Sequence, residues 1–197
     1  MKNICFGILL FVLPLRAADV STETAEIKKQ LENLFSESRK VNSATAKEKA
    51  TSRAKIEAAL DWDRIARDCL GAKETKKQGA ASFKQFNNLL HDVIVKTAYT
   101  RLDKFWDGGT TYTFTKVDPK GKDAHVVVEF KVGEDPFNLD YYLTKKGPNW
   151  VVYDISYEGL RYSENINEQI VAFLKEKGFI SLLDKLKKRR DELESKS

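Results

Sequence analysis

The chain has few of the residues on which disulfide-stabilised proteins and many enzymes depend. Its 197 residues include two cysteines, two histidines, four prolines and one methionine. Cys5 lies in a segment typical of a leader, so Cys69 stands alone in the rest of the chain, which excludes an internal disulfide. Because neither a histidine nor a second cysteine accompanies it, we expect Cys69 to be a small buried residue and not a reactive thiol.

Motifs of common catalytic and nucleotide-binding sites are also missing. The sequence contains no HExxH, GxSxG, P-loop or dinucleotide-binding pattern. Asp154 and His125 are the two groups that could serve as the general base of an enzyme. Because no partner base or oxyanion donor can be named for Asp154, a structural acid is the better interpretation. We therefore predict no catalytic and no metal-binding residues.

No apolar run is long enough to cross a bilayer as an anchored helix, and the most apolar one lies at the start of the chain. Lys2 precedes the segment from Ile4 to Leu15, and small residues follow from Ala17. This order is typical of a secretory signal peptide. We predict a signal peptide over residues 1–17 and a single mature domain over residues 18–197, without a lipid anchor.

Neither sign of charge dominates the sequence. The formal net charge is +5, and removal of the leader takes away two basic residues and no acidic one. The basic run from Lys187 to Arg190 is followed directly by Asp191 and Glu192. It fits a solvated, fraying helix end better than a nucleic-acid patch. We expect no nucleic-acid partner.

Strand-forming residues are concentrated between Thr110 and Tyr157. Four runs there, TTYTFTKV, DAHVVVEFKV, FNLDYYLTKK and NWVVYDISY, are separated by Gly, Pro, Asp or Asn. They predict consecutive antiparallel strands joined by short turns. Side chains alternate between the faces of a strand, so Val128 and Phe130 in the second run, like Leu139 and Tyr141 in the third, belong to one apolar face.

Helical spacing of apolar residues appears on both sides of this strand region. The expected helices are one through Ile27 and Leu34, a weakly anchored one over residues 42–55, a short one between the N-cap Asp61 and Gly71, a long one from a capping box at Thr75 to Leu102, and two near the C-terminus separated by Gly178. The fold class is therefore α+β, with an antiparallel sheet of about four strands backed by helices. The Phe and Leu stripe of the long helix is expected to face the apolar side of the sheet.

Three segments, in their order and spacing, point to one known family. They are LDWDRIARDCLG at residues 60–71, VKTAYTRL at residues 95–102 and NWVVYDISYEGL at residues 149–160. With Asn165 and Gln169 they resemble the MlaC family, also called the toluene-tolerance family, over nearly the whole mature chain. The segment RYSENIN departs from the family, which usually has an apolar stretch after the Glu-Gly turn.

The resemblance implies a soluble periplasmic phospholipid carrier that serves an ABC transport system maintaining outer-membrane lipid asymmetry. It implies a strongly curved sheet, related to the NTF2-like cone, that encloses an apolar pocket. The phospholipid is the cargo, with its acyl chains inside and its head group outside, and no other cofactor is expected. The implied partners are an inner-membrane complex of an MCE-domain protein with an ABC transporter and an outer-membrane lipoprotein complex, and the carrier itself is expected to be a monomer.

We expect the pocket wall to be drawn from the long helix and the sheet. In the fourth run, strict alternation places Val151, Tyr153 and Ile155 on one face and Trp150, Val152 and Asp154 on the other. The candidate lipid-binding residues are Phe83, Phe86, Leu90, Ile94, Val128, Phe130, Leu139, Tyr141, Val151, Tyr153 and Ile155. The alternatives are an NTF2-like enzyme acting on an apolar small molecule, a carrier of another apolar lipid, and a protein with a filled core that only bridges membrane complexes.

We predict that the protein is exported and cleaved after Ala17, because a short apolar segment followed by small residues is the substrate of signal peptidase. N-terminal sequencing of the protein from the periplasmic fraction should begin at Ala18. A periplasmic form that begins at Met1 would contradict this prediction.

Overall fold

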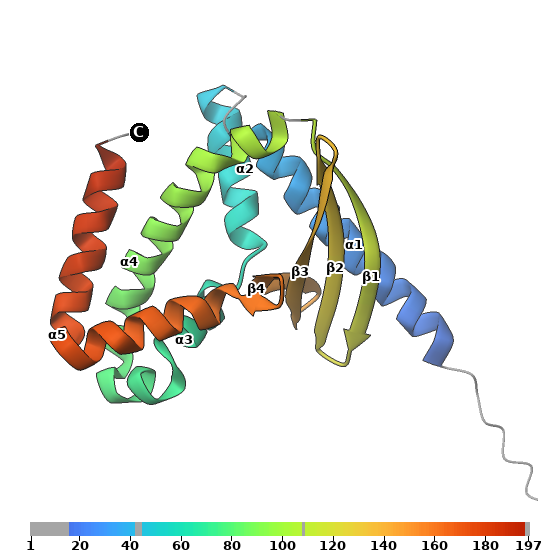
Figure 1. Cartoon of the computed structure of the whole chain (residues 1–197). Helices are drawn as coiled ribbons and strands as arrows, with labels where there is room; N and C mark the ends of the chain where they lie inside the picture. The colour runs from blue at the N-terminus through green and yellow to red at the C-terminus, as the bar shows by residue number, and fades with distance from the viewer. Residues whose placement is uncertain (1–15, 42–44, 108, 196–197) are drawn as a thin grey trace, which may run out of the picture.

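The computed structural model describes residues 16–41, 45–107 and 109–195, and most of the predicted signal peptide, residues 1–15, lies outside them. In chain order the elements are α1 (Arg16–Lys40), α2 (Ala46–Ala58), α3 (Trp62–Leu70), α4 (Ala72–Asp107), β1 (Thr111–Lys120), β2 (Asp123–Val132), β3 (Asp135–Lys146), β4 (Asn149–Tyr157), β5 (Leu160–Arg161) and α5 (Tyr162–Glu194). Figure 1 shows the twisted sheet on one side of the molecule with α1 running along it, and α3, α4 and α5 gathered on the other side. No helix in the described part of the chain is long and apolar enough to cross a membrane.

The sheet is an antiparallel meander of five strands in the order β1-β2-β3-β4-β5. The predicted α+β class is confirmed. The sheet has the four expected strands and, after the Glu-Gly turn, a fifth strand of two residues that was not predicted. Val128 opposes Leu139 and Phe130 opposes Phe137 across β2 and β3. Opposed residues of an antiparallel pair point to the same side, so the predicted apolar face is confirmed in these two strands.

A β-bulge in β4 changes which of its side chains face the core. Leu143 pairs with Val152 and Tyr141 pairs with Ile155, so β4 holds one extra residue between these pairs. Val152 and Ile155 therefore share the face of Leu143 and Tyr141, while Tyr153 points to the opposite face. Strict alternation, which groups Ile155 with Tyr153, is wrong at Ile155 because it cannot anticipate the extra residue.

Helix α1 covers the apolar face of the sheet. Its Ile27, Leu31 and Phe35 are buried against β2, β3 and β4. The Phe35 ring lies 5.4 Å from the ring of Phe130 and 5.5 Å from that of Tyr141, both in edge-to-face geometry, which aromatic rings favour. The expectation that the long helix takes this place is wrong, because α1 carries an apolar stripe of the same spacing.

Helices α3, α4 and α5 bury their apolar stripes against one another. Two glycines inside the long helices, Gly79 in α4 and Gly178 in α5, have φ of 72° and 77°, in the left-handed region that favours glycine. Each interrupts the helical path, and Figure 1 shows α5 bending sharply before its last segment. The buried members of this helical cluster are Ala66, Cys69, Leu70, Phe83, Phe86, Leu89, Leu90, Ile170, Phe179, Leu182 and Leu183.

The predicted limits of α3 are confirmed, and the predicted start of α4 is not. The carboxylate of Asp61 accepts a hydrogen bond from the backbone N–H of Arg64 (3.1 Å), and Gly71 with a φ of 83° follows the last turn. Helix α4 already begins at Ala72. The Thr75 hydroxyl is therefore inside the helix, where it is buried without a hydrogen-bond partner among the described residues, so the predicted capping box is wrong.

Two segments expected to be loosely held are anchored by contacts with other helices. Lys55 of α2 forms an ion pair with Glu37 of α1 (2.9 Å). At the other end of the chain, α5 continues through the basic run to Glu194, which pairs with Lys96 of α4 (3.2 Å), and Leu193 is buried. The expected fraying after the basic run is wrong for this reason.

We predict that Cys69→Ala folds and loses about 1–3 kcal/mol of unfolding free energy, because only one buried sulfur atom is removed. Burial raises the pKa of the Cys69 thiol to about 12, so the native thiol should not react with a thiol reagent at neutral pH. Denaturant unfolding and thiol titration before and after unfolding measure both effects. Rapid labelling of the native protein would contradict the assignment.

Candidate functional site

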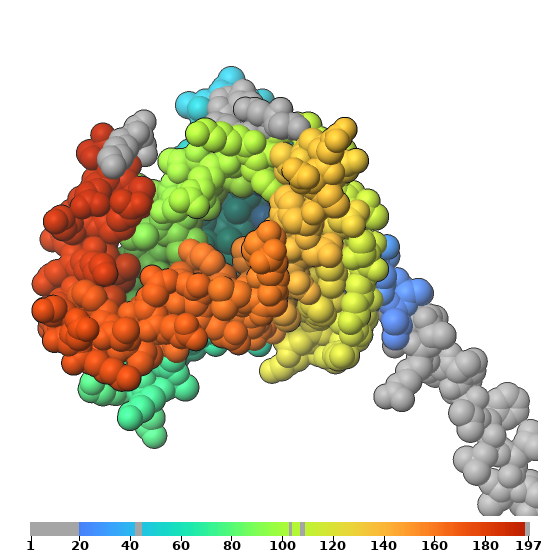
Figure 2. All heavy atoms as spheres, viewed as in Figure 1, coloured from blue at the N-terminus to red at the C-terminus, as the bar shows by residue number. Residues whose placement is uncertain are grey.

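Buried apolar side chains of the described residues form three clusters instead of the single core usual in one domain, and partly buried Leu34 and Leu60 bridge the first and the third. The first joins α1 to the sheet, the second is the α3–α5 cluster, and a small third cluster consists of Val41, Ile56 and Tyr99. Figure 2 shows a deep opening, here called the hollow, bordered by α4, the beginning of α5 and the β3–β4 side of the sheet. The blue and teal of the N-terminal helices are visible at its bottom.

The sheet side of the hollow continues the apolar face that α1 covers. Tyr141 opposes Ile155 and Leu139 opposes Tyr157, so these four side chains share that face. Tyr141 and Leu139 pack into the α1 cluster, whereas Ile155 and Tyr157 are 36% and 49% exposed. The covering by α1 thus ends before the C-terminal half of β4, where apolar surface stays bare.

The tight turn between β4 and β5 extends this apolar surface toward the rim. Glu158 and Gly159 have φ of 52° and 80°, and positive φ at both central residues is typical of a two-residue hairpin turn. Tyr157 and Leu160 pair across this turn. Leu160 and the following Tyr162 are 54% and 43% exposed. Large exposed apolar side chains gathered in one place mark binding sites more often than chance exposure does.

Helix α4 provides the opposite border. Its Ile94 packs at the edge of the α3–α5 cluster, and Val95 and Leu102 pack at the edge of the third cluster. All three side chains are only partly buried. The middle of α4 therefore spans the interval between two clusters, and apolar side chains line that interval.

The eleven residues predicted to line one pocket wall are divided among four places. One group is buried under α1 (Val128, Phe130 and Tyr141), and a second is buried among the helices (Phe83, Phe86 and Leu90). A third group points to the outer face of the sheet (Val151 and Tyr153). The last group lies on the elements that border the hollow (Ile94, Leu139 and Ile155). The structure therefore does not bring these residues together on one wall. Their role in binding lipid stays a prediction.

The rim residues Tyr157, Leu160 and Tyr162 are absent from the sequence-based prediction. The signal that could have found them is Glu158-Gly159, a dipeptide suited to a two-residue turn and followed by an alternating apolar, polar, apolar pattern. Reading that pattern as a fifth strand would have placed Tyr157 and Leu160 opposite each other.

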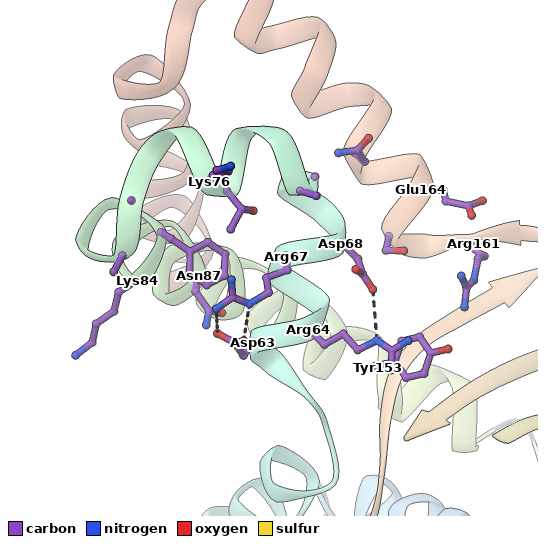
Figure 3. Close-up of a pocket in the computed structure, with 18 of the residues that line it drawn as sticks. Asp63, Arg64, Arg67, Asp68, Lys76, Lys84, Asn87, Tyr153, Arg161 and Glu164 are labelled. Atoms are coloured by element: carbon purple, nitrogen blue, oxygen red, sulfur yellow. Dashed lines mark hydrogen bonds and ion pairs between the residues drawn. The ribbon is translucent and has the colours of Figure 1, made fainter. Parts of the chain in front are cut away.

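A second concavity, here called the outer groove, lies on the face of β4 that carries Tyr153. It has a volume of about 1260 Å³ and lies between α3, the first turns of α4 and the start of α5 (Figure 3). The Arg64 guanidinium lies 3.2 Å from the centre of the Tyr153 ring and 3.2 Å from the carboxylate of Asp123. Burying acyl chains against so many charged groups would be costly, so the outer groove does not suit an apolar ligand. Its charged lining includes Asp63, Arg64, Arg67, Asp68, Lys76 and Arg161.

Asp154 is a structural acid, as predicted. Its carboxylate accepts hydrogen bonds from the backbone N–H of Ile155 (2.9 Å), from the backbone N–H of Ser163 (3.2 Å) and from the Ser163 hydroxyl (2.6 Å). It also lies 3.3 Å from the guanidinium of Arg161. Because Ser163 is in the first turn of α5, Asp154 caps that helix from the neighbouring strand. These contacts occupy both carboxylate oxygens.

His125 lies on the outer face of the sheet. Its Nε2 is 2.6 Å from a carboxylate oxygen of Asp140, and its ring stacks on Tyr142. It is not among the residues that line the outer groove. Neither of the two candidate bases therefore points into an apolar cavity, and the hollow is the feature suited to an apolar ligand.

Comparison with known proteins agrees with this architecture. Residues 24–188 match the family described as "MlaC protein", and the chain belongs to the MlaC family. Among solved structures, a phospholipid-binding protein from Ralstonia solanacearum in complex with a phospholipid shares the fold, with a TM-score of 0.71 and 19% sequence identity over 86% of this chain and 97% of that one. No curated protein matches the chain.

We predict that Asp154→Ala lowers the unfolding free energy by about 2–3 kcal/mol, because it removes the cap of α5 and leaves Arg161 without its carboxylate. Asp140→Ala is the matched control on the same face of the sheet, at a side chain that is 23% exposed against 2% for Asp154, and should cost less than about 1 kcal/mol. Denaturant unfolding compares the two variants. An Asp154→Ala protein of unchanged stability would contradict the capping role.

Proposed function

We propose that this protein is a phospholipid carrier that shelters acyl chains in the hollow. The observation that carries the proposal is an apolar sheet face left uncovered beside the hollow, with Ile155, Tyr157 and Leu160 exposed along it. Exposed apolar surface of this kind is unfavourable in water, and an acyl chain would remove it from water without requiring any polar group.

The free energy of burying acyl chains is large enough to hold such a cargo. Each sheltered methylene contributes about 0.8 kcal/mol, so two dozen contribute on the order of 20 kcal/mol before any costs. The same quantity opposes removal of the lipid from a membrane. A carrier of this kind therefore needs partners that deliver and receive its lipid.

Two comparisons support a phospholipid as the cargo. The chain belongs to the MlaC family, and the Ralstonia solanacearum protein of the same fold is a phospholipid-binding protein in complex with a phospholipid. The fold shared with that protein covers most of this chain, which supports the same class of ligand for the hollow.

The partners and the location of the carrier form part of the same proposal. We place it in the periplasm as a monomer, where it shuttles phospholipid between an outer-membrane lipoprotein complex and an inner-membrane complex of an MCE-domain protein with an ABC transporter. The predicted signal peptide supports export. Such a shuttle would contribute to outer-membrane lipid asymmetry and solvent tolerance.

Native mass spectrometry of the purified protein tests the cargo most directly. A copurifying phospholipid supports the proposal, and a different copurifying apolar molecule identifies another cargo. A protein that copurifies with nothing and converts a small apolar substrate would instead be an enzyme, which overturns the proposal.

We predict that Ile155→Asp folds but copurifies with little phospholipid. Ile155 is partly exposed at the hollow, so a carboxylate there stays hydrated in the empty protein, whereas lipid entry would desolvate it at a cost of several kcal/mol. Circular-dichroism melting and the lipid extracted per protein molecule are measured together.

Two further variants make this result specific. Ile180→Asp changes an isoleucine that is 72% exposed on the last segment of α5 and should keep both fold and lipid. Val128→Asp places the same charge in the sealed cluster under α1 and should prevent folding. Full lipid loading of a folded Ile155→Asp protein would show that this sheet face is not the binding surface.

A further inference from the structure

A polar cluster centred on His91 ties α4, one border of the hollow, to α2 and α3. The Nε2 atom of His91 lies 2.6 Å from a carboxylate oxygen of Glu57 in α2, and its Nδ1 atom lies 3.1 Å from a carboxylate oxygen of Asp92. Its ring meets the ring of Trp62 in α3 edge to face, with 4.5 Å between centres. The Tyr99 hydroxyl of α4 donates a second hydrogen bond to Glu57 (3.2 Å).

This geometry favours a protonated imidazole. A carboxylate oxygen only accepts hydrogen bonds, and His91 presents both of its ring nitrogens to carboxylates. A neutral imidazole has a single N–H, so one nitrogen would direct its lone pair at a carboxylate oxygen. Loss of the proton therefore weakens one of the two contacts and removes the charge attraction from both.

Charged groups from the surrounding helices act on the same cluster. Glu57 from α2 and Asp92 from α4 face His91 directly, while α3 contributes only the uncharged Trp62 ring. Next to Glu57, the guanidinium of Arg53 lies over the ring of Tyr99, 4.9 Å from the ring centre. Arg190 from α5 interacts electrostatically with Asp92. The two carboxylates that contact the ring favour the imidazolium.

We propose that the His91–Glu57 contact is a pH-sensitive latch of the hollow, which holds α4 against α2 while His91 is protonated and lets α4 move away when the proton is lost. This inference rests on the proposed function, because the consequence of a loosened α4 is faster exchange of the lipid in the hollow. The other contacts described between α2 and α4 gather around Tyr99, two helical turns beyond His91: its hydrogen bond to Glu57, the Arg53 guanidinium over its ring and the small third cluster.

The direction of the pH dependence follows from the pKa of His91. The hydrogen bond to Glu57 raises this pKa most, burial lowers it, and Asp92 raises it further, so that it lies above the ordinary imidazole value. A raised folded-state pKa means that the latch is fully present below the ordinary value and is lost as pH rises through the raised one. Each unit of pKa shift corresponds to about a tenfold change in the opening equilibrium.

The test follows transfer of a pyrene-labelled phosphatidylcholine from the loaded protein to excess unlabelled phosphatidylcholine vesicles between pH 5.5 and 9. These vesicles keep the same charge over this range, so changes in rate report on the protein. The wild-type rate should rise by up to about tenfold per unit of pKa shift, with its midpoint at the His91 titration seen by NMR. His91→Gln should give a rate independent of pH.

Two other variants serve as control and second test. His125→Gln removes the only other histidine, on the outer face of the sheet, and should keep the wild-type pH profile. Glu57→Gln should lower the NMR midpoint of His91, and the midpoint of the transfer rate must move with it. A pH-independent wild-type rate, a wild-type profile in His91→Gln, or midpoints that move separately would overturn the latch.

Failure of the proposed function gives a different result. If the wild-type protein loads no labelled phospholipid at any pH, the carrier proposal fails. The pH dependence of the His91–Glu57 contact is then tested only by amide hydrogen exchange of α4. After correction for intrinsic exchange, α4 should open more above the His91 midpoint in the wild type and equally at all pH values in His91→Gln. Opening that does not depend on His91 would overturn the latch in this setting too.

Discussion

The packing of α1 on the apolar face of the sheet is the interaction on which the rest of the structure depends. Phe35 at its centre contacts aromatic rings on β1, β2 and β3, and this cluster closes without any contribution from the α3–α5 cluster. Because α1 seals most of the face, α4 reaches it only near its C-terminal end, where the rings of Phe105 and Trp106 pack close to Phe130. The hollow is the space left between the sheet, which α1 covers, and the helices α3, α4 and α5, which pack against one another.

Polar and backbone contacts hold the helical half to the sheet, together with the packing of Phe105 and Trp106 of α4 against the cluster under α1. The backbone of Val152 in β4 exchanges hydrogen bonds with Ala59 (2.9 Å) and Asp61 (2.8 Å) at the junction of α2 and α3. On the other side of the same strand, Asp154 fixes the start of α5 through Ser163. Directional bonds of this kind fix the distance between the two halves, so they keep apart two apolar surfaces that would otherwise close on each other.

The sequence predicts the strands and most helix limits, because those depend on local patterns such as the alternation in β2 and β3 and the cap at Asp61. It does not predict which helix covers the sheet: α1 and α4 carry stripes of the same spacing, and only the length and direction of the connections decide between them. The bulge at Tyr153 cannot be predicted from the sequence either, since nothing in NWVVYDISY distinguishes a regular strand from one with an extra residue. For these two reasons the residues predicted to form one pocket wall lie in several places, and their role in binding lipid stays a prediction.

The bulge also lets the two faces of β4 change independently of each other. Tyr153 is the extra residue of β4, so a one-codon deletion there would restore regular alternation and leave Ile155 on the side of the hollow. The same deletion would remove the aromatic ring over which Arg64 lies and so change the β4 wall of the outer groove. A change of a single residue can therefore alter the outer face of β4, while the apolar lining on the other face of the same strand keeps its alternation.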